Sequence, residues 1–86
     1  MSDYELTLVF REETKAAESQ AKTLVTGKII SIKDWGVKDL AYPIKGKKRG
    51  QYLHLEIELE PDQVAGLEKI LEQNETLLRY LLISQH

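Results

Sequence analysis

The chain has 86 residues, a net charge of −2 and no cysteine, which excludes a disulfide framework, a thiolate metal site and a thiol nucleophile. This length predicts a single domain over residues 1–86, with little room for a deep catalytic cleft, in the reducing cytoplasm. No export signal is recognisable at the start, and no apolar run approaches the roughly 20 residues that span a bilayer, so we expect no membrane association.

Charge is unevenly distributed along the chain. Between Lys28 and Arg49 there are seven Lys or Arg residues and two carboxylates, Asp34 and Asp39, so this segment carries +5. Because the whole chain carries −2, the remaining residues carry −7. Such an asymmetry favours a polyanionic partner that contacts one edge of an otherwise acidic protein.

A strand and a helix are predicted first. In residues 3–10 every second side chain is apolar, which is the period of a strand with one buried face. These residues are Tyr4, Leu6, Leu8 and Phe10, and they alternate with Glu5, Thr7 and Val9. Residues 11–26 predict a helix that stops before Gly27. Its apolar stripe is formed by Ala17, Ala21, Leu24 and Val25.

Residues 28–44 predict a second strand. It is expected to kink at Trp35-Gly36, because a Gly inside a strand pattern marks a bulge. Pro43 has no N–H to donate to a neighbouring strand, which favours a sheet edge at this end. Residues 45–50 then predict a turn or mobile loop.

The remaining elements are a strand, a helix and a last strand. Residues 52–59 form a hairpin with the second strand and direct Tyr52, His54, Glu56 and Glu58 to one face. Pro61 opens a second helix, which stops near Asn74. Its apolar stripe comprises Val64, Leu67, Ile70 and Leu71. Residues 77–84 predict the final strand.

The order β-α-β-β-α-β predicts an α+β fold of the ferredoxin-like split type. This fold has a four-stranded antiparallel sheet with two helices on one face. The other face carries Glu5, His54, Glu56, Glu58 and Arg79, and is expected to meet solvent or a partner.

The sequence contains little that predicts catalysis. His54 and His86 are the candidate acid–base residues, and neither has a Ser, Asp or Glu at the spacing of a triad or metal motif. For His54 a structural role is the simpler interpretation, with pH sensing or RNA contact as alternatives. A divalent ion could be shared by Glu56, Glu58 and Glu60, although a charged solvent-facing side is the simpler account. We therefore predict no catalytic residue, metal site, cofactor or small-molecule substrate.

An acylphosphatase-like enzyme is the alternative that shares this fold. Its chemistry requires a phosphate-binding loop with an Arg after the first strand. Here the first strand is followed by Arg11-Glu12-Glu13, where two carboxylates would repel a phosphate. The sequence thus argues against this activity.

The cations Lys45, Lys47, Lys48 and Arg49 have two interpretations. They could contact a phosphate backbone, or they could keep a solvated hairpin tip soluble and protect a sheet edge. An RNA-recognition motif would need aromatic residues on the third strand, where Gln51, Leu53 and Leu55 stand instead. Binding directed by RNA shape is therefore favoured over reading of a single strand.

Two motifs carry a family resemblance. Asp34-Trp35-Gly36, then Leu40-Ala41-Tyr42-Pro43-Ile44 and a basic stretch ending at Gly50, resembles the signature of the bacterial small-subunit ribosomal protein six family. The similarity also includes Tyr4-Glu5, Gly27-Lys28-Ile29, Asn74 and Arg79. It covers nearly the whole chain, which resembles a short variant with a shorter first helix and no C-terminal tail.

The resemblance implies a structural component of the small ribosomal subunit in the cytoplasm. Members bind the central domain of the subunit's RNA as a heterodimer with small-subunit ribosomal protein eighteen, without a reaction, cofactor or obligatory metal. Lys38 matches one of two basic positions after the first motif, where Val37 replaces the other, and Arg79 matches an Arg before the last strand. The predicted RNA-binding residues are thus Lys38, Lys45, Lys47, Lys48, Arg49 and Arg79.

Protein contacts are expected near the same motifs. Trp35 and Tyr42 could anchor the core or face a partner, and with Pro43 they are the predicted partner-binding residues. Three positions depart from the basic residues of the family pattern, namely Ser2, Glu72 and Ser84. A non-ribosomal adaptor that binds a protein partner on the same scaffold is therefore the alternative function.

Overall fold

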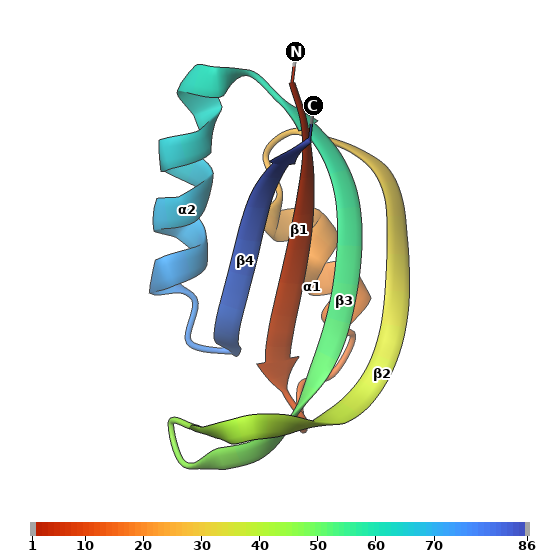
Figure 1. The fold of residues 1–86 in the computed structure, drawn as a ribbon, viewed down its shortest axis with the longest axis vertical. Coiled ribbons are helices and arrows are strands. Elements are labelled where there is room, and N and C mark those ends of the chain that lie inside the picture. The colour runs from red at the N-terminus through yellow and green to blue at the C-terminus, as the bar shows by residue number, and fades with distance from the viewer. Residues whose placement is uncertain (1, 86) are drawn as a thin grey trace.

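A computed structural model describes residues 2–85 and shows strands and helices in the predicted order (Figure 1). The strands are β1 (Ser2–Arg11), β2 (Lys28–Ile44), β3 (Lys47–Leu59) and β4 (Leu77–Gln85). The helices are α1 (Ala17–Leu24) and α2 (Val64–Gln73), and a short 3-10 turn, η1 (Pro61–Gln63), directly precedes α2. His86, a candidate acid–base residue, lies outside the described residues.

The sheet has the order β2-β3-β1-β4, and all neighbouring strands are antiparallel. Both helices contribute to the same core, so the predicted ferredoxin-like α+β fold is confirmed. β2 lies at an edge, as the presence of Pro43 predicted. The register between β2 and β3 is irregular between Asp39 and Ile44, the segment that contains Pro43.

The core lies between the sheet and the two helices. β4 contributes Leu77 to the core, and the other buried strand residues of the core are alternate apolar positions of β1 and β3, because successive side chains point to opposite faces of a sheet. These fully buried residues are Leu6, Leu8, Phe10, Leu53, Leu55, Ile57 and Leu59. From α2, Leu67 and Leu71 pack on them, whereas Ile70 is 38% exposed, so its predicted place in the buried stripe is wrong. Adjacent residues of a helix are about 100° apart around its axis, so Ile70 points away from the sheet when its neighbour Leu71 points toward it.

The first helix is shorter than residues 11–26, so that prediction is wrong at both ends. Arg11 is still part of β1, and α1 has eight residues, from Ala17 to Leu24. The Gln51 side-chain amide donates to the carbonyls of Arg11, Glu12 and Thr14, at 3.4, 2.9 and 2.6 Å. A helix starting at residue 11 would need such carbonyls for its own hydrogen bonds, so Gln51 favours the non-helical turn.

The predicted turn or loop at residues 45–50 is also wrong in extent. The chain turns within two residues, Lys45 and Gly46, and β3 begins at Lys47. Both turn residues have positive φ, 51° and 77°, which is the combination that a type I′ hairpin turn requires. This turn matches the twist of the flanking strands, so Lys47 to Arg49 project from a strand.

The predicted kink at Trp35-Gly36 is confirmed. The β2–β3 register shifts between Asp34 and Gly36, which leaves Trp35 as an extra residue on β2. Asp34 Oδ1 accepts a hydrogen bond from the Gly36 N–H at 2.7 Å, and Gly36 has φ 79°. The Asp-Trp-Gly motif therefore encodes the bulge, through a side-chain acceptor and a residue that tolerates positive φ.

Gly36→Val should destabilise the fold by about 1–3 kcal/mol, because a β-branched residue is strained at positive φ. An added Cβ would meet nothing within 4 Å, so the cost is expected to come from the backbone alone. Gly36→Asn is the matched control, since Asn tolerates this conformation better. The measurement is the urea midpoint with the m-value checked, and an unchanged midpoint for the Val variant would contradict the strain.

Candidate nucleic-acid interface

The β2–β3 hairpin carries four cations at one end of the molecule. We call Lys45–Arg49 the basic arm; it belongs to the tip of the hairpin at the bottom of Figure 1, where the end of β2 and the start of β3 pass together below the sheet toward β4. The type I′ turn and the start of β3 present these side chains on a defined backbone. Lys48 and Arg49 are exposed, and Lys47 is partly exposed.

Two cations of the basic arm are already paired with carboxylates. Lys47 Nζ lies 3.4 Å from Glu13 Oε1, and Arg49 contacts Glu12 at 3.5 Å and Asp39 at 3.2 Å. The pKa of Glu13 is lowered, first by a hydrogen bond from its own backbone and then by Lys47. Across residues 2–85, no carboxylate lies within ion-pair distance of Lys48.

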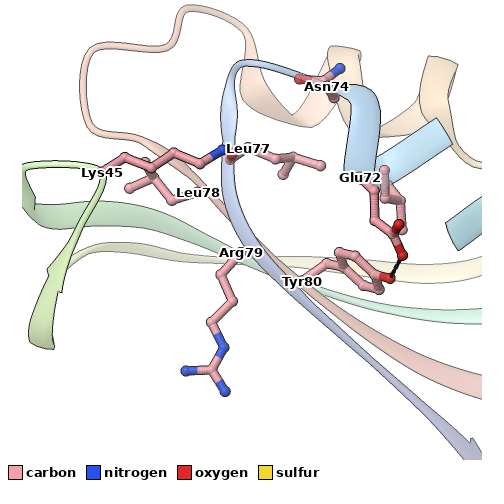
Figure 2. A pocket seen from close by; sticks show the side chains of 8 residues that line it. Lys45, Glu72, Asn74, Leu77, Leu78, Arg79 and Tyr80 are labelled. Atoms are coloured by element: carbon pink, nitrogen blue, oxygen red, sulfur yellow. Dashed lines mark hydrogen bonds between the residues drawn. The ribbon is translucent and has the colours of Figure 1, made fainter. Parts of the chain in front are cut away.

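Lys45 extends from the turn toward the start of β4. Its Nζ donates to the Leu77 carbonyl at 3.3 Å, which ties the basic arm to β4. Figure 2 shows this reach across a cavity of about 280 Å³, where the side chain of Arg79 points away from Tyr80 and Glu72. The cavity is lined by Lys45, Leu71, Glu72, Asn74, Leu77, Leu78, Arg79 and Tyr80.

The opposite wall of this cavity is acidic. Tyr80 Oη donates a hydrogen bond to Glu72 Oε2 at 2.8 Å (Figure 2). It also lies 3.1 Å from Glu68 Oε2. Burial, followed by the two carboxylates, raises the pKa of Tyr80 above its ordinary value. An anion in the cavity is therefore favoured near Lys45 and Arg79 and disfavoured near Glu72.

Trp35 lies on the open face of the sheet, opposite the helices. It is 45% exposed and stacks on His54, with ring centroids 4.8 Å apart and planes 3° from parallel. Lys38 Nζ lies 5.2 Å from the Trp35 ring centroid and 5.8 Å from that of Tyr52. The partner-facing interpretation of Trp35 agrees with this exposure, and the core interpretation does not.

His54 has close polar neighbours as well as Trp35. Its Nδ1 lies 3.3 Å from Thr7 Oγ1, and its Nε2 lies 3.5 Å from Glu5 Oε1. These contacts fix the imidazole ring under the indole. The open face therefore carries an aromatic and cationic cluster, which we define as Trp35, Lys38, Tyr52 and His54.

Tyr42 and Pro43 lie on the exposed side of the hairpin. Tyr42 is 59% exposed, and its hydroxyl accepts a hydrogen bond from Arg79 Nη1 at 3.4 Å. Pro43 lines a shallow groove of about 310 Å³ with Tyr42 and Lys48. Tyr42, like Trp35, is a surface residue and no core anchor.

The structure brings several of the predicted site residues together. Lys45 and Arg79 line one cavity, Arg79 contacts Tyr42, and Lys38 lies over Trp35. Tyr52 and His54 lie near Trp35 and Lys38, a grouping that was not predicted from the sequence. Their alternation with the buried Leu53 and Leu55 was the available signal, because it directs them to the open face.

No group of three or more His, Asp or Glu residues within residues 2–85 is arranged to hold a metal ion. No helix in this part of the chain is long and apolar enough to cross a membrane.

Comparison with known proteins identifies the family. A family model described as "Ribosomal protein S6" matches residues 3–84. Three curated relatives named "Small ribosomal subunit protein bS6" are each 35% identical to this chain. The alignment with the relative from Pelagibacter ubique covers 96% of this chain and 75% of the relative. The corresponding shares are 84% and 79% for Caldanaerobacter subterraneus subsp. tengcongensis, and 99% and 81% for Ruthia magnifica subsp. Calyptogena magnifica.

A solved structure supports the fold independently. The crystal structure of 30S ribosomal protein S6 from Thermotoga maritima superposes with a TM-score of 0.84 at 18% sequence identity. The match covers 98% of this chain and 87% of that one. With the family model and the curated relatives, it follows that this chain belongs to the ribosomal protein S6 family of the small ribosomal subunit, a family of ribosomal proteins and not of enzymes.

Proposed function

We propose that this chain binds the central domain of small-subunit ribosomal RNA together with small-subunit ribosomal protein eighteen. The observation that carries the proposal is the concentration of cations around the hairpin and the start of β4. Phosphate contacts from such a surface supply affinity without reading sequence. The proposed RNA-binding residues are Lys38, Lys45, Lys47, Lys48, Arg49 and Arg79.

The partner protein is proposed to dock around Trp35, Tyr42 and Pro43. Trp35 and Tyr42 are exposed aromatic side chains, which are common anchors of protein interfaces. β2 is an edge strand, so its outer backbone groups are available for pairing with another chain. These features support a docking surface on β2.

The charge distribution supports the proposed role of a partner. The segment from Lys28 to Arg49 carries +5 and the rest of the chain −7, so phosphates near the body of the protein are repelled. A basic partner would supply positive charge beside the basic arm. Binding of the RNA and of the partner should therefore favour each other.

We expect this chain to bind a central-domain RNA fragment weakly alone and about 5–150-fold more tightly in the presence of small-subunit ribosomal protein eighteen. The measurement is titration calorimetry at one fixed salt concentration, with and without the partner. Equal affinities in the two titrations would contradict the cooperative proposal. Binding tighter than about 1 μM by the lone chain would show that its own RNA surface is sufficient.

A further inference from the structure

An acidic turn, Glu12-Glu13, lies beside the basic arm and is held there through its backbone. The Gln51 amide, at the base of the arm on β3, donates to the Glu12 carbonyl and to its neighbours in the turn. Arg11 anchors the other side, since its Nε donates to the Glu75 carbonyl at 3.0 Å. The position of the acidic turn is therefore fixed by groups other than its own carboxylates.

The carboxylates of the acidic turn occupy cations that RNA would use. Glu13 pairs with Lys47 and Glu12 with Arg49, at 3.4 and 3.5 Å. All four side chains are about half exposed, so a phosphate can reach the cations without opening the core. Exposed pairs of this kind are weak and exchange readily with other anions.

We propose that the acidic turn is an intramolecular competitor for the basic arm, one that RNA phosphates must displace from Lys47 and Arg49. The inference rests on the proposed function, because it needs RNA to bind at the arm. Each of these two carboxylates contacts one cation in the free protein and loses that contact to a phosphate in the complex, while Arg49 also contacts Asp39 at 3.2 Å. Free Lys48 can make the first phosphate contact before either pair opens.

The competition has the same cost for every RNA that uses the arm. A polyanion that contacts only the basic arm binds weakly, so the free energy needed to displace the two carboxylates cancels most of its binding free energy. An RNA that also engages the cavity and the partner protein binds tightly enough to retain its complex. The acidic turn thereby suppresses adventitious binding without reading any base.

The test is the double substitution Glu12→Gln and Glu13→Gln, measured with poly(U) and with the central-domain RNA fragment. We expect this variant to bind both RNAs about five- to tenfold more tightly than wild type at about 50 mM salt. The gain in affinity should be smaller at about 0.5 M salt, because salt screens the attraction of the cations both to the carboxylates and to the phosphates.

The matched control is Asp3→Asn with Asp62→Asn, which changes the net charge by the same amount. Both residues are exposed and lie at the end of the molecule opposite the basic arm, at the start of β1 and in η1 (Figure 1). We expect the control to gain less than about twofold, since charges beyond a Debye length of about 10 Å are screened. Equal gains in the two double variants would overturn the inference.

Gln51→Met tests the same inference without changing any charge. Without the Gln51 amide the acidic turn is no longer held beside the basic arm. RNA affinity should therefore rise, as in the Glu12→Gln and Glu13→Gln variant, by about two- to fivefold. If circular dichroism shows that this variant does not fold, the comparison of the two charge variants alone decides whether the inference holds. If neither the wild-type protein nor any of the variants binds either RNA, the proposed function is contradicted, and the inference with it.

Discussion

Replacing Lys45, Lys47, Lys48 and Arg49 by Gln should weaken RNA binding a few hundredfold at about 0.1 M salt. Removal of three or four phosphate contacts should make the slope of log K against log salt shallower by about 3, because each contact releases about 0.9 counterion. The fold should persist, since these side chains lie at the end of a hairpin outside the core. The measurement is a binding titration at several salt concentrations.

The control for this variant removes four cations elsewhere. Lys22, Lys28, Lys33 and Lys69 are exposed, and none of them belongs to the basic arm. Their replacement by Gln changes the net charge equally and should leave the salt slope nearly unchanged. An unaltered slope in the arm variant would move the RNA surface elsewhere and leave the arm as a solubility device.

Leu55→Ala should destabilise the protein by about 2–5 kcal/mol. Leu55 is 0% exposed and lies in the middle of β3, opposite Leu6 on β1 and Ile32 on β2. Truncation removes apolar contacts and leaves a cavity that the neighbouring strands cannot fill. Urea unfolding monitored by circular dichroism measures the loss as a lower midpoint.

Leu81→Ala is the matched control, because it deletes the same atoms from the other face of the sheet. Leu81 is 48% exposed on β4, so its loss should cost less than about 1 kcal/mol. Similar losses in the two variants would contradict the assignment of one buried and one open face.

The regular parts of the fold could be predicted because local patterns determine them. Alternation of apolar and polar side chains located the buried face of β3, from Leu53 to Leu59. The bounds of β2 were predicted as observed, and Pro43 indicated its edge position. The bulge at Trp35 was predicted from Gly36, whose positive φ the structure confirms.

Other features depend on residues that are distant in sequence. The start of α1 was mispredicted because Gln51, on β3, binds the carbonyls of the preceding turn. The stacking of Trp35 on His54 joins two strands and follows from their register at a bulge. The pairing of the basic arm with Glu12 and Glu13 required the same tertiary information.

The strand order also determines when this sheet can form during synthesis. β1 is made first and lies inside the sheet, where its partners are β3 on one side and β4 on the other. β2 and β3 are joined by a two-residue turn and can pair as soon as both have emerged, whereas β1 must wait for strands much later in the chain. Completion of the sheet is therefore a late event, and the apolar side of β1 is without its neighbours while the chain grows. A nascent chain of this kind is prone to association until β4 is made.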